Sequence, residues 1–157
     1  MRTAIIYASK TGTTRDCANL LKDKLSSDVQ VIDLKTVENP NVADYDKIIV
    51  GSAIYMGRPL KEVVNFCMKN KEILLHKHIS FFFCGLETDE RIKADASNYI
   101  AVELMERASI IDYFGGELHH DKVNFIDKFI MKQMEKTLKV KTGIRTEEIE
   151  KFAEEVE

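Results

Sequence analysis

The sequence has few of the features that break, cross-link or anchor a chain. Two prolines and seven glycines among 157 residues argue against a disordered or fibrous protein. The three cysteines, Cys17, Cys67 and Cys84, are odd in number and form no CxxC pair, so we expect reduced thiols rather than a disulfide framework or zinc site. No stretch approaches the roughly 20 apolar residues that span a bilayer. The first apolar run stops at Ser9 and Lys10, too early for a signal peptide, so we expect a cytoplasmic protein.

The composition is that of an ordinary globular chain. Hydrophobic residues make up 45% of it and charged residues 31%, which suits a protein with one sizeable core. The net charge of −3 provides no basic surface, so we expect no nucleic-acid partner. We therefore expect a single domain over residues 1–157.

Short apolar runs alternate with amphipathic segments along the chain. Strands are expected at residues 2–8, 29–34, 47–52, 79–84 and 110–114. Helices are expected at residues 13–25, 60–68, 89–108 and 147–156. Strands that alternate with helices form βαβ units, and right-handed crossovers leave few topologies. The pattern predicts an α/β protein with a doubly wound, five-stranded parallel sheet and helices on both faces.

A cluster of hydroxyl side chains separates the first expected strand from the first helix. It consists of Ser9, Lys10, Thr11, Gly12, Thr13 and Thr14. A helix N-terminus offers a phosphate unpaired N–H groups and the positive end of the helix dipole, and hydroxyls can donate further hydrogen bonds. The cluster has neither the P-loop pattern nor the GxGxxG dinucleotide pattern. The alternative is a helix capped by Thr11 or Thr13, but the position after the first strand of an α/β sheet favours a phosphate site.

Three motifs in register give the chain a family resemblance. SKTGTT is similar to the flavodoxin phosphate loop, of pattern Ser/Thr-x-Thr-Gly-x-Thr, and matches every fixed position. YDKIIVGSAIYMG resembles the third strand and second FMN loop of flavodoxins, and FFFCGLETD resembles their fourth strand and third FMN loop. The resemblance implies a flavodoxin-like fold with strand order 2-1-3-4-5, and it implies FMN as the cofactor.

The resemblance also assigns residues to the two parts of FMN. The phosphate is expected at residues 9–14, and the isoalloxazine ring between two later loops that contain Ala53, Ile54, Tyr55, Met56, Gly57, Cys84, Gly85 and Leu86. Tyr55 is the aromatic expected to stack on the ring, with Met56 as the alternative. Gly57 is the family position whose peptide turns toward a reduced flavin. Many flavodoxins carry a tyrosine soon after the Cys-Gly, and its absence here leaves one face of the ring open or covered by Leu86 alone.

Other reactive side chains near these loops have ordinary interpretations. Cys84 has no histidine near it in the sequence and is expected to be a buried structural thiol. His119 and His120 are expected at the surface. Arg58 is a cation beside the second loop, where it would favour an anionic reduced flavin. No metal site is predicted, and the catalytic residues stay unknown.

The segment at residues 119–142 goes beyond the simple alternation. It contains six lysines and three acids, and its apolar residues mark one face of an expected helix. Residues 124–134 resemble the insertion of the flavodoxin-like, quinone-dependent protoporphyrinogen oxidases. The Ser-Ala-Ile at 52–54 also resembles the small-small-Ile of those enzymes more than the Ser-Thr-aromatic of flavodoxins. Such a face can rest on a membrane surface or cover a quinone or porphyrin. It can equally pack on the domain and fill its core.

Two functions follow from these resemblances, and both stay open. One is an FMN-dependent oxidoreductase similar to protoporphyrinogen oxidase, with a porphyrinogen as substrate, a quinone as acceptor and peripheral membrane contact through residues 119–142. The other is a flavodoxin-type electron carrier between redox partner proteins, without a small substrate. The inserted segment and the missing aromatic of the third loop favour the oxidoreductase.

Overall fold

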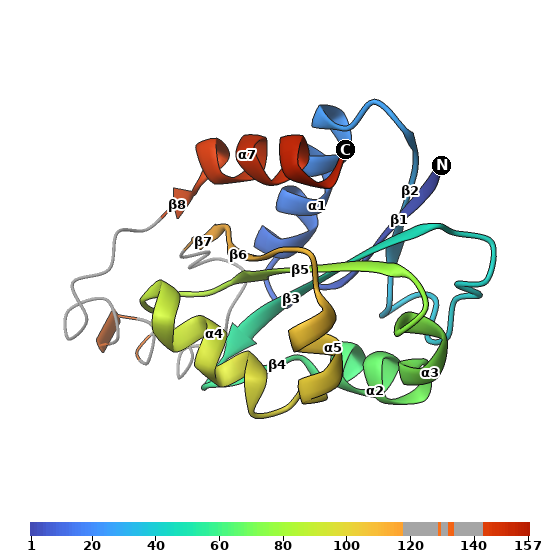
Figure 1. Ribbon diagram of the computed structural model, residues 1–157. Coiled ribbons are helices and arrows are strands. Elements are labelled where there is room, and N and C mark those ends of the chain that lie inside the picture. The colour runs from blue at the N-terminus through green and yellow to red at the C-terminus, as the bar shows by residue number, and fades with distance from the viewer. Residues whose placement is uncertain (118–128, 130–131, 134–142) are drawn as a thin grey trace.

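Five parallel strands form the centre of the molecule in the computed structural model, which describes residues 1–117, 129, 132–133 and 143–157 (Figure 1). Their order across the sheet is β2 (Asp28–Asp33), β1 (Arg2–Ala8), β3 (Lys47–Tyr55), β5 (His78–Cys84) and β6 (Ile111–Tyr113). Counting these strands along the chain gives the order 2-1-3-4-5. The predicted doubly wound parallel sheet is therefore confirmed.

The described residues also form two short antiparallel pairs, of which one extends this sheet and the other is a separate two-stranded sheet. β4 (Arg58–Pro59) folds back on the end of β3, with Ile54 opposite Pro59. β7 (Gly115–Gly116) pairs with β8 (Gly143–Ile144), which lies 27 residues further along the chain than Gly116 by their numbers. Neither pair was predicted, because two-residue strands contain too little alternation to stand out in a sequence.

Helices cover both faces of the sheet (Figure 1). The blue and red helices, α1 (Thr13–Lys24) and α7 (Thr146–Val156), lie on one face and share an apolar layer with alternate residues of β1, β3 and β5. The opposite face carries α2 (Lys61–Lys69), α3 (Lys71–Leu74), α4 (Asp89–Ser97) and α5 (Val102–Arg107). Because both faces are covered, the central strands are nearly continuously apolar, as is usual in parallel sheets.

A column of aromatic rings fills the layer beneath α7. Phe82 stacks on Phe114 with 4.7 Å between ring centroids, and Phe114 meets Phe152 edge to face at 5.2 Å. Gly51, the neighbour of Phe82 in the sheet, leaves the space for this ring, since a Cβ there would lie 2.1 Å from its Cζ. The column packs α7 directly onto the centre of the sheet.

The helix predicted at residues 89–108 is wrong as a single element. α4 ends at Ser97 and α5 begins at Val102, with Ile100 buried in the link between them. The apolar residues from Ile92 to Ala108 recur every four positions, and each such step advances about 40° around a straight helix. One straight helix would carry this stripe away from the sheet, and the break keeps Ile100 and Leu104 in the core.

Within the described residues, no helix is both long enough and apolar enough to cross a bilayer.

Candidate functional site

The loop between β1 and α1 is built as an open helix start. β1 ends at Ala8, and Gly12 takes the N-cap position of α1 with φ 107°, in the left-handed region that suits glycine. The Gly12 N–H donates to Ser9 Oγ at 3.0 Å, which closes the loop. The N-cap residue is thus Gly12, which has no side chain to cap the helix, and not Thr11 or Thr13 as the alternative expected. The first turn of an uncapped helix offers N–H groups to an anion.

Thr14 carries the clearest sign that the loop is built for a ligand. Its Oγ1 is buried and has no hydrogen-bond partner among the described residues, and Thr14 as a whole is 1% exposed. An unpaired buried hydroxyl costs about 1–3 kcal/mol, so native proteins rarely leave one. Thr14 lines the hollow at the carboxyl edge of the sheet, where a ligand oxygen can supply the missing partner. The hydroxyl-rich loop therefore fits a phosphate group.

One hollow joins this loop to the ends of β3 and β5. Ala53, Ile54, Tyr55 and Met56 line it from the second expected loop, and the third contributes Cys84, Gly85 and Leu86. Of the predicted site residues, Ser9, Lys10, Thr11, Thr13 and Thr14 also line it, and only Gly12 and Gly57 do not. Gly12 borders a neighbouring hollow with Arg15 and Asp33. The geometry brings the predicted set together, while its part in binding stays a prediction.

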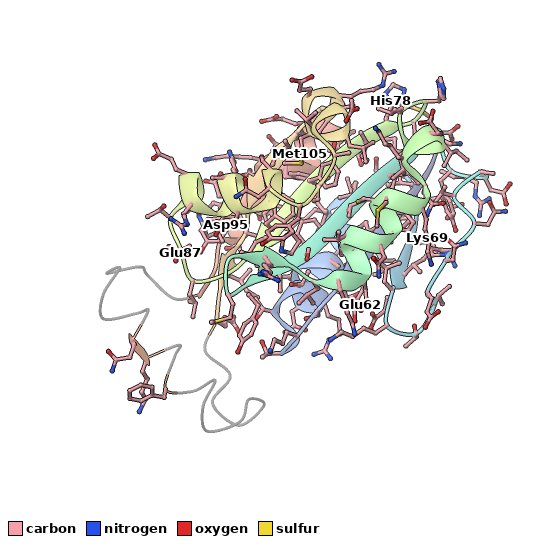
Figure 2. All side chains as sticks on the ribbon, turned by 90° about the horizontal axis from the view of Figure 1, so that it is seen from below. Glu62, Lys69, His78, Glu87, Asp95 and Met105 are labelled. Carbon is pink, nitrogen blue, oxygen red and sulfur yellow. The ribbon has the colours of Figure 1, made fainter. Side chains whose placement is uncertain are left out.

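The second loop is a tight hairpin. Tyr55 pairs with Arg58, and the two residues between them both have positive φ, 53° at Met56 and 75° at Gly57. A two-residue hairpin with this backbone is a type I′ turn. A Cβ on Gly57 would lie 3.7 Å from Oδ2 of Asp95, a residue of α4 (Figure 2), and α4 contacts β4 of the hairpin. Helix α4 thus supports the hairpin from outside the hollow.

Tyr55 is the one aromatic among the described residues that line the hollow. The Lys10 Nζ lies 3.3 Å from the centroid of its ring, so the phosphate loop and the hairpin touch across the hollow. Arg58 does not line the hollow, and its guanidinium lies 5.5 Å from the centroid of Tyr99 instead. Among the described residues, the cation that lines the hollow is Lys10, and the effect of Arg58 on a reduced flavin stays a prediction.

Close contacts with β6 and β7 hold the backbone of the third loop in place. The Gly85 N–H donates to Gly115 O at 3.0 Å, and the Tyr113 hydroxyl donates to Gly85 O. A Cβ on Gly116 would lie 2.2 Å from Gly85 O, so only glycine allows this approach. Gly116 and Glu117 consequently line the hollow, and the sequence reading missed both. The Gly-Gly pair after the fifth strand was the available signal, because that position lies at the same carboxyl edge.

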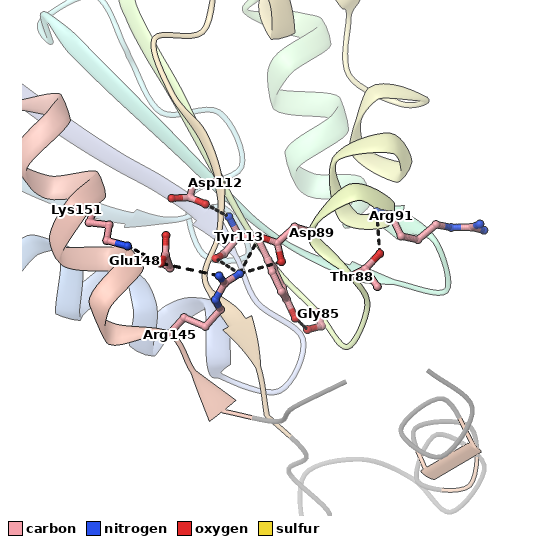
Figure 3. A network of polar contacts seen from close by, with 9 residues as sticks. All are labelled: Gly85, Thr88, Asp89, Arg91, Asp112, Tyr113, Arg145, Glu148 and Lys151. Atoms are coloured by element: carbon pink, nitrogen blue, oxygen red, sulfur yellow. Dashed lines mark hydrogen bonds and ion pairs between the residues drawn. The ribbon is translucent and has the colours of Figure 1, made fainter. Parts of the chain in front are cut away.

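An ionic network ties the third loop to the C-terminal helix (Figure 3). The Arg145 Nη1 contacts both carboxylate oxygens of Asp89, at 2.9 and 3.0 Å, and its guanidinium lies 5.2 Å from the centroid of Tyr113. Burial raises the pKa of Tyr113 to about 12, so its hydroxyl keeps the proton that it donates to Gly85. Asp89 lies in the first turn of α4, so Arg145 pairs with an acid at the N-terminus of that helix.

Several expectations lie outside the described residues. His119 and His120 do, and so does the expected helix at residues 119–142, except for Phe129, Lys132 and Gln133. Contact with a membrane through this segment stays a prediction.

The parallel sheet, the hydroxyl-rich loop before α1 and the two further loops at the carboxyl edge define a flavodoxin-like α/β protein. Residues 4–144 match the family described as "Flavodoxin domain", and the chain belongs to this family.

Relatives in sequence and in structure extend this assignment. The chain is 23% identical to the protoporphyrinogen IX dehydrogenase [quinone] of Escherichia coli K12 over 158 residues, which covers 94% of this chain and 86% of the relative. A protein of the same name from Leishmania major is 23% identical over 82% of this chain and 61% of that protein. The predicted resemblance to this group is confirmed.

Solved structures show the same fold at low identity. Oxidised flavodoxin 1 from Bacillus cereus has a TM-score of 0.57 and 18% identity, over 99% of this chain and 96% of that one. A flavoprotein from Lactobacillus acidophilus NCFM, solved in complex with FMN, has a TM-score of 0.55 and 14% identity, over 71% of this chain and 92% of that one. At these identities the likeness supports the fold alone.

Proposed function

We propose that the protein binds FMN, with the phosphate at the N-terminus of α1. The observation that carries the proposal is the buried, unpartnered hydroxyl of Thr14 beside an uncapped helix start. A phosphate would accept hydrogen bonds from this hydroxyl and from the first-turn N–H groups of α1. Membership of the flavodoxin domain family supports the same cofactor. Bound FMN supplies one- and two-electron transfer, which the amino-acid side chains do not.

The walls of the hollow suit the isoalloxazine ring. Tyr55 offers an aromatic face, Leu86 an apolar side chain that is 7% exposed, and Met56 a flexible thioether at the hairpin tip. Lys10 is the cation among the lining residues, and it would favour an anionic ligand or an anionic reduced ring. The protein would hold the isoalloxazine ring between the hairpin and the third loop, and Lys10 would balance the negative charge of the reduced ring.

Replacing Thr14 with Val tests the phosphate position. Val keeps the shape but removes the hydroxyl, so the affinity for FMN is expected to fall about tenfold or more, the value of one hydrogen bond to a charged group. The affinity for riboflavin, which has no phosphate, is expected to stay unchanged, and Thr14→Ser is the matched control that keeps the hydroxyl. Both affinities are measured by quenching of flavin fluorescence. Equal losses for FMN and riboflavin would show that Thr14 does not hold the phosphate.

We further propose that the protein is an oxidoreductase which uses FMN to oxidise a porphyrinogen and passes the electrons to a quinone. Two observations support this. The relatives from Escherichia coli and Leishmania major carry the name of that activity. The third-loop side of the hollow is lined by Leu86, Gly116 and Glu117, which leaves it without an aromatic cover among the described residues. The second candidate is a flavodoxin-type carrier, which the family match supports equally.

A reductive titration and a turnover assay separate the two candidates. An oxidoreductase is expected to oxidise porphyrinogen with a quinone acceptor, to lose that turnover without FMN, and to accumulate little semiquinone. A carrier is expected to accumulate a stable semiquinone and to show no turnover. The second result would reject the oxidoreductase while leaving the FMN site intact.

A further inference from the structure

Two of the chain's three cysteines meet at the wall of the hollow, although 67 positions separate them. Cys17 lies on α1, one turn beyond the phosphate loop, and Cys84 is the last residue of β5. Their Sγ atoms are 3.7 Å apart, with the Cys84 thiol donating to Cys17 Sγ. Both side chains are buried in the apolar layer between α1 and the sheet, at 0% and 2% exposure.

The two thiols differ in their access to the hollow. Cys84 is one of its lining residues and Cys17 is not, so a small reagent that enters the hollow meets Cys84 first. The contact with the neighbouring Cys84 thiol, together with burial, raises the pKa of the Cys17 thiol, which therefore stays protonated at neutral pH. This arrangement matches an attacked cysteine with a second, resolving cysteine behind it.

The distance between the sulfurs is small enough to close by local adjustment. A disulfide needs its sulfurs about 2.05 Å apart, so the pair has to approach by roughly 1.6 Å from its present separation. Cys67 provides the contrast within the same chain. It is equally buried, at 2% exposure, but it lies on α2 in the layer on the opposite face of the sheet. Burial alone therefore does not distinguish the pair, whereas proximity and access to the hollow do.

We propose that Cys17 and Cys84 form a redox-active pair that hydrogen peroxide oxidises to an intramolecular disulfide through the hollow. The Cys84 sulfur attacks the O–O bond of the peroxide, which yields a sulfenic acid and one water. The Cys17 sulfur then displaces the sulfenic hydroxyl, which forms the S–S bond and releases a second water. In total, two thiols and one peroxide give one disulfide and two waters. A ligand in the hollow covers Cys84 and shields the pair, and this last clause rests on the proposed binding of FMN.

The test begins with native, FMN-free protein treated with hydrogen peroxide, quenched and then denatured for thiol counting. Two of the three thiols are expected to disappear, and digestion is expected to yield the peptide pair joined through Cys17 and Cys84. Cys67→Ala is expected to behave like the wild type at the other two positions. In Cys17→Ala, Cys84 is expected to stop at a sulfenic acid that dimedone traps, and in Cys84→Ala, Cys17 is expected to stay reduced.

Two results would contradict the proposal that Cys17 and Cys84 form a disulfide. One is that the Cys67 thiol is lost as fast as the other two thiols, and the other is that Cys84 of the wild type is oxidised without forming a bond to Cys17. The shield is tested separately. FMN at about ten times its Kd leaves about one site in ten open, so oxidation is expected to slow about tenfold. If the rate of thiol oxidation is unchanged when fluorescence verifies that FMN occupies the site, bound FMN does not protect Cys84. If FMN does not bind at all, the fluorescence shows this. Oxidation of the FMN-free protein still decides whether Cys17 and Cys84 form a disulfide.

Discussion

At the scale of single residues, Met56 holds a backbone conformation that glycine and asparagine adopt more easily. It is the one non-glycine residue with positive φ in the described part of the chain, and its side chain is 57% exposed. The left-handed region costs a residue with a Cβ about 1–2 kcal/mol, and Asn-Gly is the favoured pair in a type I′ turn. Met56→Asn is therefore expected to stabilise the FMN-free protein by about 0.5–1 kcal/mol.

Urea unfolding measures this gain as a higher midpoint with an unchanged slope. Met56→Ala is the matched control, because it removes the same exposed side chain but keeps the backbone cost. If Met56→Ala and Met56→Asn are equally stable, the turn carries no strain.

Asp112 gives the fold a dependence on pH. Burial raises the pKa of this carboxyl and Glu148 adds to the increase, while the hydrogen bond from the Tyr113 N–H and the charges of Lys93 and Arg145 oppose it. A carboxyl with a raised folded pKa contributes stability below its unfolded pKa and loses it as the pH rises through the folded value. At neutral pH the ionised group is thus a cost, and Asp112→Asn is expected to stabilise the protein by less than about 1 kcal/mol, because the site is partly solvated.

In the protein, the Tyr113 N–H donates to Asp112 Oδ1 over a nitrogen–oxygen distance of 2.8 Å. The side-chain amide of the Asn variant keeps an oxygen that can accept this hydrogen bond. Thermal melts across pH check the sign. The advantage of Asp112→Asn should shrink as the pH falls and vanish below about pH 4, near the ordinary pKa of an aspartate. An advantage that is constant over this range would exclude titration of Asp112 as its cause.

At the scale of elements, the sequence predicted what depends on repeated patterns. The five strands and the first helix stand close to their predicted bounds, because apolar runs and four-residue spacings are visible locally. The break between α4 and α5 was invisible, since it depends on where the sheet lies beneath Ile100 and Leu104. The β7–β8 pair was invisible for another reason: Gly115 needs positive φ, and a Cβ there would lie 2.2 Å from Gly143 O, which is a contact between distant segments.

The ion pair between Arg145 and Asp89 is expected to couple helices α7 and α4. Their side chains are 37% and 52% exposed, so a double-mutant cycle with Arg145→Met and Asp89→Asn should give a coupling of about 0.5–1 kcal/mol. In 1 M salt the coupling should fall, because exposed pairs are screened. The pair of Glu148 and Lys151 within α7 is the control and should couple by only about 0.2–0.5 kcal/mol. A coupling no larger than that of the control would mean that Arg145 does not join the helices.

At the scale of the whole molecule, the sequence located the site better than it located the contacts around it. The three motifs are far apart in the chain, yet each follows a parallel strand, and parallel strands in one sheet end at one edge. That rule was enough to predict that residues of the first three loops lie together and line one hollow. It could not supply Gly116 and Glu117, whose place depends on the Gly85 backbone beneath them, nor the approach of Cys17 to Cys84 across two elements.

The hollow exists only in the folded chain, because its walls come from the ends of β1, β3 and β5 and from β7. A ligand that binds there must therefore raise the stability of the whole domain. FMN at about 100 times its Kd is expected to add about 2.7 kcal/mol, and for a chain of this size that shifts the melting temperature by roughly 5–10 °C. Riboflavin lacks the phosphate and adenosine monophosphate lacks the flavin, so at equal concentration each is expected to give a smaller shift. If adenosine monophosphate matches FMN, the hollow recognises a phosphate without the ring. If riboflavin matches FMN, the open start of α1 and the unpartnered Thr14 hydroxyl have no role in holding the cofactor.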